Sequence, residues 1–71
     1  MQSALLRARA HGRHSRTRYE YTVVQNTQGM FEILEVKVED QPAFAGTGRR
    51  FSTLEAAFES GHALARLLID D

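Results

Sequence analysis

The chain has 71 residues, with nine lysines and arginines, nine aspartates and glutamates, one proline and no cysteine. This length allows a single domain with one small core. The longest apolar runs span only three residues, whereas a helix needs roughly 18–20 apolar residues to cross a bilayer. We therefore predict one cytoplasmic domain without disulfide bonds, and we expect no association with a membrane.

The zero net charge hides an uneven distribution along the chain. Residues 1–18 carry five arginines and no acidic residue, whereas residues 19–71 carry four basic and nine acidic side chains. A basic segment joined to an acidic domain is typical of an interaction tail, or of an arm that folds back on its own domain. The five arginines are Arg7, Arg9, Arg13, Arg16 and Arg18.

This composition predicts a basic, largely disordered arm over residues 1–17 and a single α+β domain over residues 18–71. Within the arm, the stretch from Ser3 to Ala10 has the composition of a short helix that Gly12 would end. Two turns of helix are too short to be stable in water by themselves, so this helix would require contacts with the domain.

The clearest strand covers residues 19–25, where Tyr19, Tyr21 and Val23 alternate with polar residues. Turn-forming residues follow, and Gly29 suits the positive φ that closes a hairpin loop. The pattern therefore predicts a β-hairpin whose second strand begins directly after Gly29.

That second strand is expected over residues 30–39. Its apolar side chains fall on one face up to Ile33 and on the other face from Leu34 onward. This change of phase predicts either a β-bulge or partial coverage of both faces. Further along, residues 43–45 or 49–51 are expected to add a short third strand.

A long helix is predicted over residues 53–69. Ser52 and Glu55 have the spacing of a capping box, which places the start of the helix at the next residue. Gly61 in its middle indicates that helix and sheet approach too closely for a Cβ atom. The apolar face repeats with helical spacing and consists of Leu54, Ala57, Phe58, Gly61, Leu64, Ala65 and Leu68.

Together these elements predict an α+β two-layer sandwich of β-β-β-α order, with one helix on one face of an antiparallel sheet. Because one helix cannot cover both faces, we expect an apolar strip on the open face or edge, unless Leu5 and Leu6 fold over it. We predict a small binding or regulatory module that contacts a protein partner or a second copy of the chain. The expected interface residues are Tyr19, Tyr21, Phe31 and Ile33.

Nucleic-acid binding is the alternative function, because arginine side chains neutralise phosphates and nearby tyrosines stack on unpaired bases. The glycines at positions 46 and 48, just ahead of the helix, favour an anion site, although a flexible turn explains the same residues. The acidic domain would repel a duplex lying across it. The residues assigned to this function are Arg7, Arg9, Arg13, Arg16, Arg18, Arg49 and Arg50.

The sequence favours neither catalysis nor a metal centre. The chain has no cysteine and Ser52 is expected to cap the helix, so no group of nucleophile, base and orienting residue can be assembled. His11 and His14 lie among arginines that repel a metal dication. His62 shares a helix face with Glu59 and Arg66, and we expect these three residues to form a surface ion-pair ladder. We therefore expect no enzyme activity, no cofactor and no bound metal.

The element order and residues 45–57, with their Gly-x-Gly turn, serine cap and Glu-Ala helix start, resemble two families. Residues 19–69 look like the small unit of Hic-type antitoxins, which usually continue past the helix into a DNA-binding element or strand. The order also resembles the double-stranded-RNA-binding domain, whose second helix begins with phosphate-binding lysines; this chain has Thr53, Leu54 and Ala57 there. More generally, it is similar to short proteobacterial proteins with a tyrosine-rich hairpin and an Ala-rich terminal helix.

Overall fold

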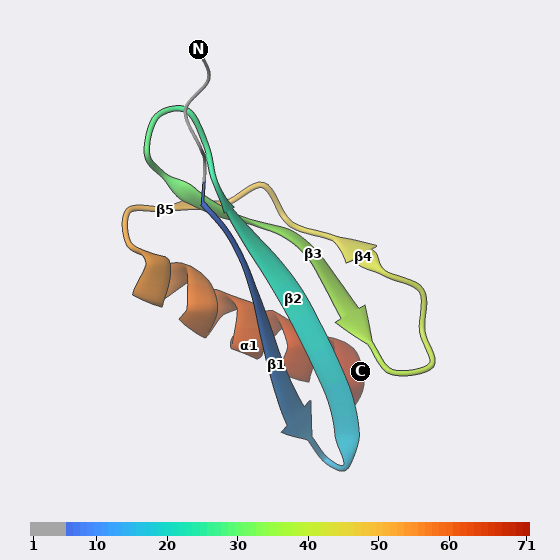
Figure 1. Ribbon diagram of the computed structural model, residues 1–71. Coiled ribbons are helices and arrows are strands. Elements are labelled where there is room, and N and C mark those ends of the chain that lie inside the picture. The colour runs from blue at the N-terminus through green and yellow to red at the C-terminus, as the bar shows by residue number, and fades with distance from the viewer. Residues whose placement is uncertain (1–5) are drawn as a thin grey trace.

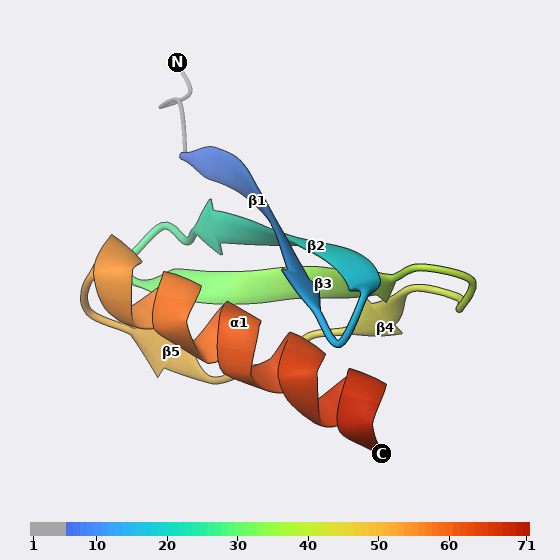
Figure 2. The ribbon, with the colours of Figure 1, turned by 90° about the horizontal axis from the view of Figure 1, so that it is seen from below.

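The structure is a computed structural model that describes residues 6–71. A five-stranded antiparallel sheet is covered on one face by a single helix (Figures 1 and 2). The strand order is β1-β2-β3-β4, and β5 also pairs with β3. The predicted α+β two-layer fold is confirmed. Its elements are β1 (Arg7–His14), β2 (Thr17–Gln25), β3 (Phe31–Val38), β4 (Phe44–Ala45), β5 (Arg50–Phe51) and α1 (Leu54–Asp70).

The first strand, β1, corrects the prediction of a disordered arm. It pairs with β2 along its whole length, from Arg7 opposite Val24 to His14 opposite Thr17. The sequence Arg-Ala-Arg-Ala at its start has the period of two that suits a strand with one exposed face. The basic segment is therefore an arm folded back on its own domain, and it is ordered because β2 supplies its hydrogen-bond partners.

The same strand overturns the prediction of a short helix ending at Ala10, because β1 is already extended from Arg7 onward. The part of that expected helix in residues 1–5 lies outside the described residues. Ser15 and Arg16 connect β1 to β2, and both have positive φ values, of 51° and 68°. Two such residues in succession form the tight turn whose twist matches that of the flanking strands.

The predicted hairpin of residues 19–39 corresponds to β2 and β3. Its loop closes as expected, because Gly29 has a φ of 84° and the Asn26 N–H donates to the Met30 carbonyl at 2.8 Å. The Asn26 side-chain oxygen also accepts hydrogen bonds from the backbone N–H groups of Gln28 and Met30, at 2.9 and 3.0 Å. The asparagine thus holds both sides of the turn.

A β-bulge at Leu34 accounts for the change of phase in β3. Thr22 pairs with Glu35 and the next residue, Val23, pairs with Ile33, so Leu34 has no partner in β2. One extra residue exchanges the two faces of a strand. The apolar side chains before and after the bulge consequently lie on the same face, towards α1. The first of the two predicted explanations is confirmed.

Both candidate third strands form, and both lie against the outer edge of β3 (Figure 1). β4 pairs with the second half of β3 and β5 with the first half. Between them, the Gly46 N–H donates to the carbonyl of the bulged Leu34 at 3.1 Å. A Cβ atom on Gly46 would overlap the Ile33 carbonyl oxygen, so this contact requires glycine.

The helix α1 begins one residue later than predicted. Its N-cap is Thr53, whose side-chain oxygen accepts from the Ala56 N–H at 3.1 Å. The predicted capping box of Ser52 with Glu55 is therefore wrong. Phe51 belongs to β5 and the chain stays extended through Thr53, so Ser52 lies too early to cap the helix. Glu55 still lies in the first turn, where the helix dipole favours an acidic side chain.

The core lies between the sheet and α1. The helix contributes small residues to it, which allow a close approach, while the strands contribute the larger side chains. Its fully buried members are Tyr21, Val23, Val36 and Val38 from the strands and Ala57, Gly61 and Ala65 from the helix.

The helix approaches the sheet closely where Gly61 lies against the ring of Tyr21. A Cβ atom at position 61 would lie 2.5 Å from Cε1 of Tyr21, which confirms the predicted reason for this glycine. The tyrosine is only 1% exposed, and its hydroxyl donates to the Phe58 carbonyl at 3.0 Å. The ring is thus held between the backbone of α1 and the sheet.

Replacing Gly61 by alanine is expected to destabilise the fold by about 1–2 kcal/mol, because overpacking against Tyr21 outweighs the better helix propensity. The change in the free energy of unfolding should be measured by urea denaturation. Ser60→Ala, on the same turn of the helix, serves as the control and should change stability little. A Gly61→Ala variant more stable than the wild type would contradict the close approach.

Stability is also expected to fall at alkaline pH because of Tyr21. Burial, and secondarily the neighbouring Tyr19, raise the pKa of Tyr21 from 10.0 to about 12. Between these values the unfolded chain loses the phenol proton while the folded protein keeps it. The stabilisation is complete below pH 10 and declines as the pH approaches 12, by up to about 1.4 kcal/mol per pH unit.

Urea denaturation at a series of pH values tests this expectation. Tyr21→Phe should flatten the alkaline slope, while at neutral pH it loses about 1 kcal/mol with the hydrogen bond to Phe58. An unchanged slope in Tyr21→Phe would assign the alkaline transition to other groups.

Candidate functional site

The apolar residues predicted to form an interface lie in the core. Tyr19, Tyr21 and Ile33 are 8%, 1% and 7% exposed, and the half-buried Phe31 packs against the same cluster. Tyr19, Tyr21 and Ile33 therefore do not line an open surface, and Phe31 is only partly accessible. The bulge at Leu34 brings Phe31, Ile33, Val36 and Val38 of β3 to the face that β2 already presents to α1, where they pack in the core cluster under the helix.

The open face of the sheet is instead mostly polar, and its outer edge is basic. Four alternate residues of β1 point their side chains to this face, because their neighbours Ala8, Ala10, Gly12 and His14 point towards α1. Arg18 follows on the adjacent strand, directly opposite Arg13. We call this set the basic strip; it consists of Arg7, Arg9, His11 and Arg13 of β1 with Arg18 of β2.

The arginines of the basic strip form no ion pair with an acidic side chain of residues 6–71. Among the side chains of the strip, only that of His11 pairs with an acidic side chain, since its Nδ1 lies 3.5 Å from the Glu20 carboxylate. The Glu39 carboxylate lies near Arg18 but accepts from its backbone N–H, at 3.1 Å, rather than from its guanidinium. Arg13 and Arg18 are directly opposed, and like charges in this position destabilise a strand pair. The strip thus carries positive charge that the described fold does not neutralise.

The backbone of β1 is free along the same side. The Gln25 N–H donates to the Leu6 carbonyl at 2.9 Å, which makes these two residues a hydrogen-bonded pair. Because such pairs alternate along an antiparallel ladder, Ala8, Ala10 and Gly12 also bond to β2. The intervening N–H and C=O groups point outward and have no strand partner in the described chain; they belong to Arg7, Arg9, His11 and Arg13.

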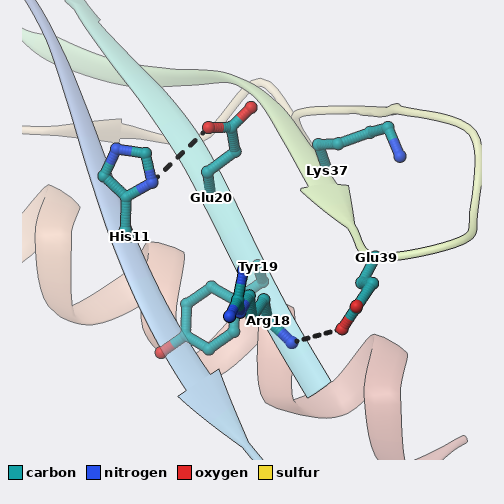
Figure 3. Close-up of a pocket in the computed structure, with 6 residues that line it drawn as sticks. All are labelled: His11, Arg18, Tyr19, Glu20, Lys37 and Glu39. Carbon is teal, nitrogen blue, oxygen red and sulfur yellow. Dashed lines mark hydrogen bonds and ion pairs between the residues drawn. The ribbon is translucent and has the colours of Figure 1, made fainter.

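Next to the basic strip the open face has a shallow depression of about 210 Å³ with side chains of both signs (Figure 3). His11 and Glu20 form its outer wall, while Lys37 and Glu39 form the opposite wall. The Lys37 ammonium donates to the backbone carbonyls of Val38 and Gln41. Because its charges are mixed and mutually close, the depression has no net preference for anions or cations.

Arg49 and Arg50 do not join the other predicted nucleic-acid-binding residues. They lie beside β3 at the opposite edge of the sheet, so β2 and β3 separate them from β1. Arg50 lies 3.6 Å from the Glu32 carboxylate, and Arg49 stacks over the Phe51 ring at 5.3 Å. The two arginines of the predicted turn ahead of α1 therefore make local contacts. The arginines that the sequence assigned to nucleic-acid binding are divided between the two edges of the sheet.

The histidines serve structural contacts that the sequence pattern did not reveal. His62 is joined through Nδ1 to the Tyr19 hydroxyl by a hydrogen bond of 2.6 Å, and the expected ion-pair ladder with Glu59 and Arg66 does not form. His14 lies 3.0 Å from the Asp70 carboxylate and connects the end of β1 to the end of α1. No group of three or more metal-binding side chains occurs within residues 6–71.

Searches of protein-family models, of curated proteins and of solved structures found no significant match to this chain. In residues 6–71, no helix is both long and apolar enough to cross a bilayer. The surface that stands out is therefore defined by geometry alone: an uncovered strand edge with unneutralised arginines beside it.

Reversing one charge of the basic strip is expected to stabilise the fold. Arg13→Glu replaces an opposed pair of arginines by an ion pair with Arg18, for a gain of about 0.5 kcal/mol. Arg9→Glu is the control, because Thr22 lies opposite and offers no such pairing. Thermal denaturation at low and high salt measures both variants, and the gain should shrink at high salt. A loss of stability in Arg13→Glu would contradict the opposed arrangement of the two arginines.

Proposed function

We propose that this protein is a protein-binding module that captures an extended segment of a partner as an additional strand beside β1. The observation that carries this proposal is the free edge of β1, where four residues present outward N–H and C=O groups over an eight-residue strand. Extended peptides add to exposed sheet edges by bonding to such groups.

The other edge of the sheet offers no equivalent site. β4 and β5 already pair with both halves of β3, and Gly46 bonds to the bulge between them. Each of these two strands has only two residues, so their own outer edges present few backbone groups. Strand addition is therefore favoured at β1.

A second copy of this chain fits the same edge poorly. If two β1 strands paired antiparallel through their outward groups, every hydrogen-bonded position would set an arginine or His11 against an arginine or His11. Like charges directly opposite each other destabilise strand pairing. We therefore assign the edge to a different protein.

Nucleic-acid binding has less support. Tyr19 and Tyr21, the aromatic residues expected to stack on bases, are buried under α1. Glu20 lies on the same face as the arginines, close enough to contact His11. The open face thus lacks stacking platforms, and a phosphate backbone lying across it would meet acidic side chains.

A pair of variants at one residue tests the strand-addition mechanism. The ligand is selected from a display library of random eight-residue peptides screened on the full-length protein. Arg9→Pro and Arg9→Ala both remove the guanidinium, but only proline removes the outward N–H, at a position where an edge strand tolerates it. The proline variant should bind the selected peptide about tenfold more weakly than the alanine variant. Equal affinity for both variants would overturn the proposal.

Amide exchange of the wild-type protein gives an independent readout that does not depend on whether the proline variant folds. With peptide bound, the outward amides of β1 should exchange more slowly, and the inward amide of Ala10 should change little. Failure of the screen to yield any peptide, or protection elsewhere in the protein alone, would contradict binding at this edge.

A further inference from the structure

We infer that the captured segment carries acidic side chains at alternate positions, facing the arginines of the basic strip. This inference rests on the proposed function, and it concerns the chemistry of the partner rather than the mode of its attachment. The inference follows from two features that the same residues of β1 share. Their backbone N–H and C=O groups point outward, and their side chains lie on the open face.

The first step concerns the geometry of the added strand. In a hydrogen-bonded antiparallel pair the two opposed side chains project to the same face of the sheet. A partner residue that bonds to the backbone of Arg9 therefore places its own side chain beside the Arg9 guanidinium. The same holds at Arg7 and Arg13, so every second residue of the partner segment meets the basic strip.

The second step concerns charge. The arginines at positions 7, 9 and 13 have no acidic partner in residues 6–71, and Arg18 adds further positive charge opposite Arg13. A carboxylate opposite each of them would form cross-strand ion pairs and relieve the repulsion between Arg13 and Arg18. His11 already contacts Glu20, so the partner residue opposite His11 meets less free charge.

The third step concerns the residues of the partner segment that lie between its acidic residues. Their side chains project to the side of α1, next to Ala8, Ala10 and Gly12 of β1. These three residues are half-buried and carry little or no side chain. Ala10 packs against the core, so this side continues the apolar layer between sheet and helix. Apolar side chains at the intervening positions would extend that layer. The segment that fits is thus an alternation of acidic and apolar residues.

The test compares peptides of matched composition and length by fluorescence anisotropy with the full-length protein. A seven-residue peptide alternating Glu and Val is the probe. One control replaces every Glu by Gln, and another keeps the composition but groups all Glu before all Val. We expect the alternating acidic peptide to bind at least about tenfold more tightly than either control, with an affinity that falls as salt rises.

Charge reversal on the protein provides the matching variants. Replacing Arg7, Arg9 and Arg13 together by Glu should abolish binding of the Glu-Val peptide and create binding of a Lys-Val peptide. Arg66→Glu on the exposed side of α1 is the control for a change of charge away from the edge and should leave affinity within about twofold. Circular dichroism establishes that each variant retains the fold.

The outcomes separate the inference from the proposed function. Equal binding of the Gln and Glu peptides, both sensitive to Arg9→Pro, would overturn the acidic preference and leave strand addition intact. Binding of none of the peptides would overturn both. Tighter binding of a single-stranded thymidine oligonucleotide than of the Glu-Val peptide, with Arg9→Pro and Arg9→Ala equally affected, would assign the strip to nucleic acid and overturn both as well.

Discussion

The bulge at Leu34 is the constraint on which the arrangement of the whole sheet depends. Without the extra residue, one half of β3 would turn its apolar side chains away from α1. With it, a single helix covers Tyr19, Tyr21, Val23, Ile33, Val36 and Val38 of the two central strands, and the opposite face is left mostly to charged and polar residues. Gly46 supports the bulge, because its N–H donates to the Leu34 carbonyl and because it lies so close to the Ile33 carbonyl that a Cβ atom would overlap that oxygen.

Two tyrosine rings lie against the two glycines at the centre of the layers. The Tyr21 ring lies against Gly61 of α1, and the Tyr19 ring covers Gly12 of β1, where a Cβ atom would overlap the ring. An aromatic side chain across from a strand glycine replaces the packing that glycine lacks. β1 is therefore fixed to the domain by the side chain of its neighbour, while its own side chains on that face stay small.

The sequence predicted those parts of the fold that depend on local periodicity. It failed for the parts whose structure depends on pairing with distant segments of the chain. The apolar face of α1, the turn at Gly29 and the change of phase at Ile33 were all predicted from spacing. β1 was missed because five arginines suggested a disordered tail, although the alternation of arginine with alanine already had the period of a strand. The N-cap was misplaced by one residue because Ser52 and Thr53 both carry a hydroxyl, and only the position of Phe51 in β5 distinguishes them.

The candidate site was predicted in part. Most of the arginines named from the sequence lie together on one edge, but three of the four apolar interface residues are buried and the fourth, Phe31, is half-buried. The face of the sheet on which Tyr19 and Ile33 lie depends on the register of β2 against β3. A single sequence does not give this register. His62 is a similar case: its helical position suggested solvent, and only the fold places the Tyr19 hydroxyl next to its ring.

The turn between β1 and β2 has a consequence for the order in which the sheet assembles. Ser15 and Arg16 both occupy left-handed backbone conformations, which cost non-glycine residues roughly 1–2 kcal/mol each. No residue of β1 is fully buried, so little core packing compensates for this strain. We therefore expect β2, β3 and α1 to form the cooperative unit of folding, and β1 to join it last and to separate from it first in local unfolding.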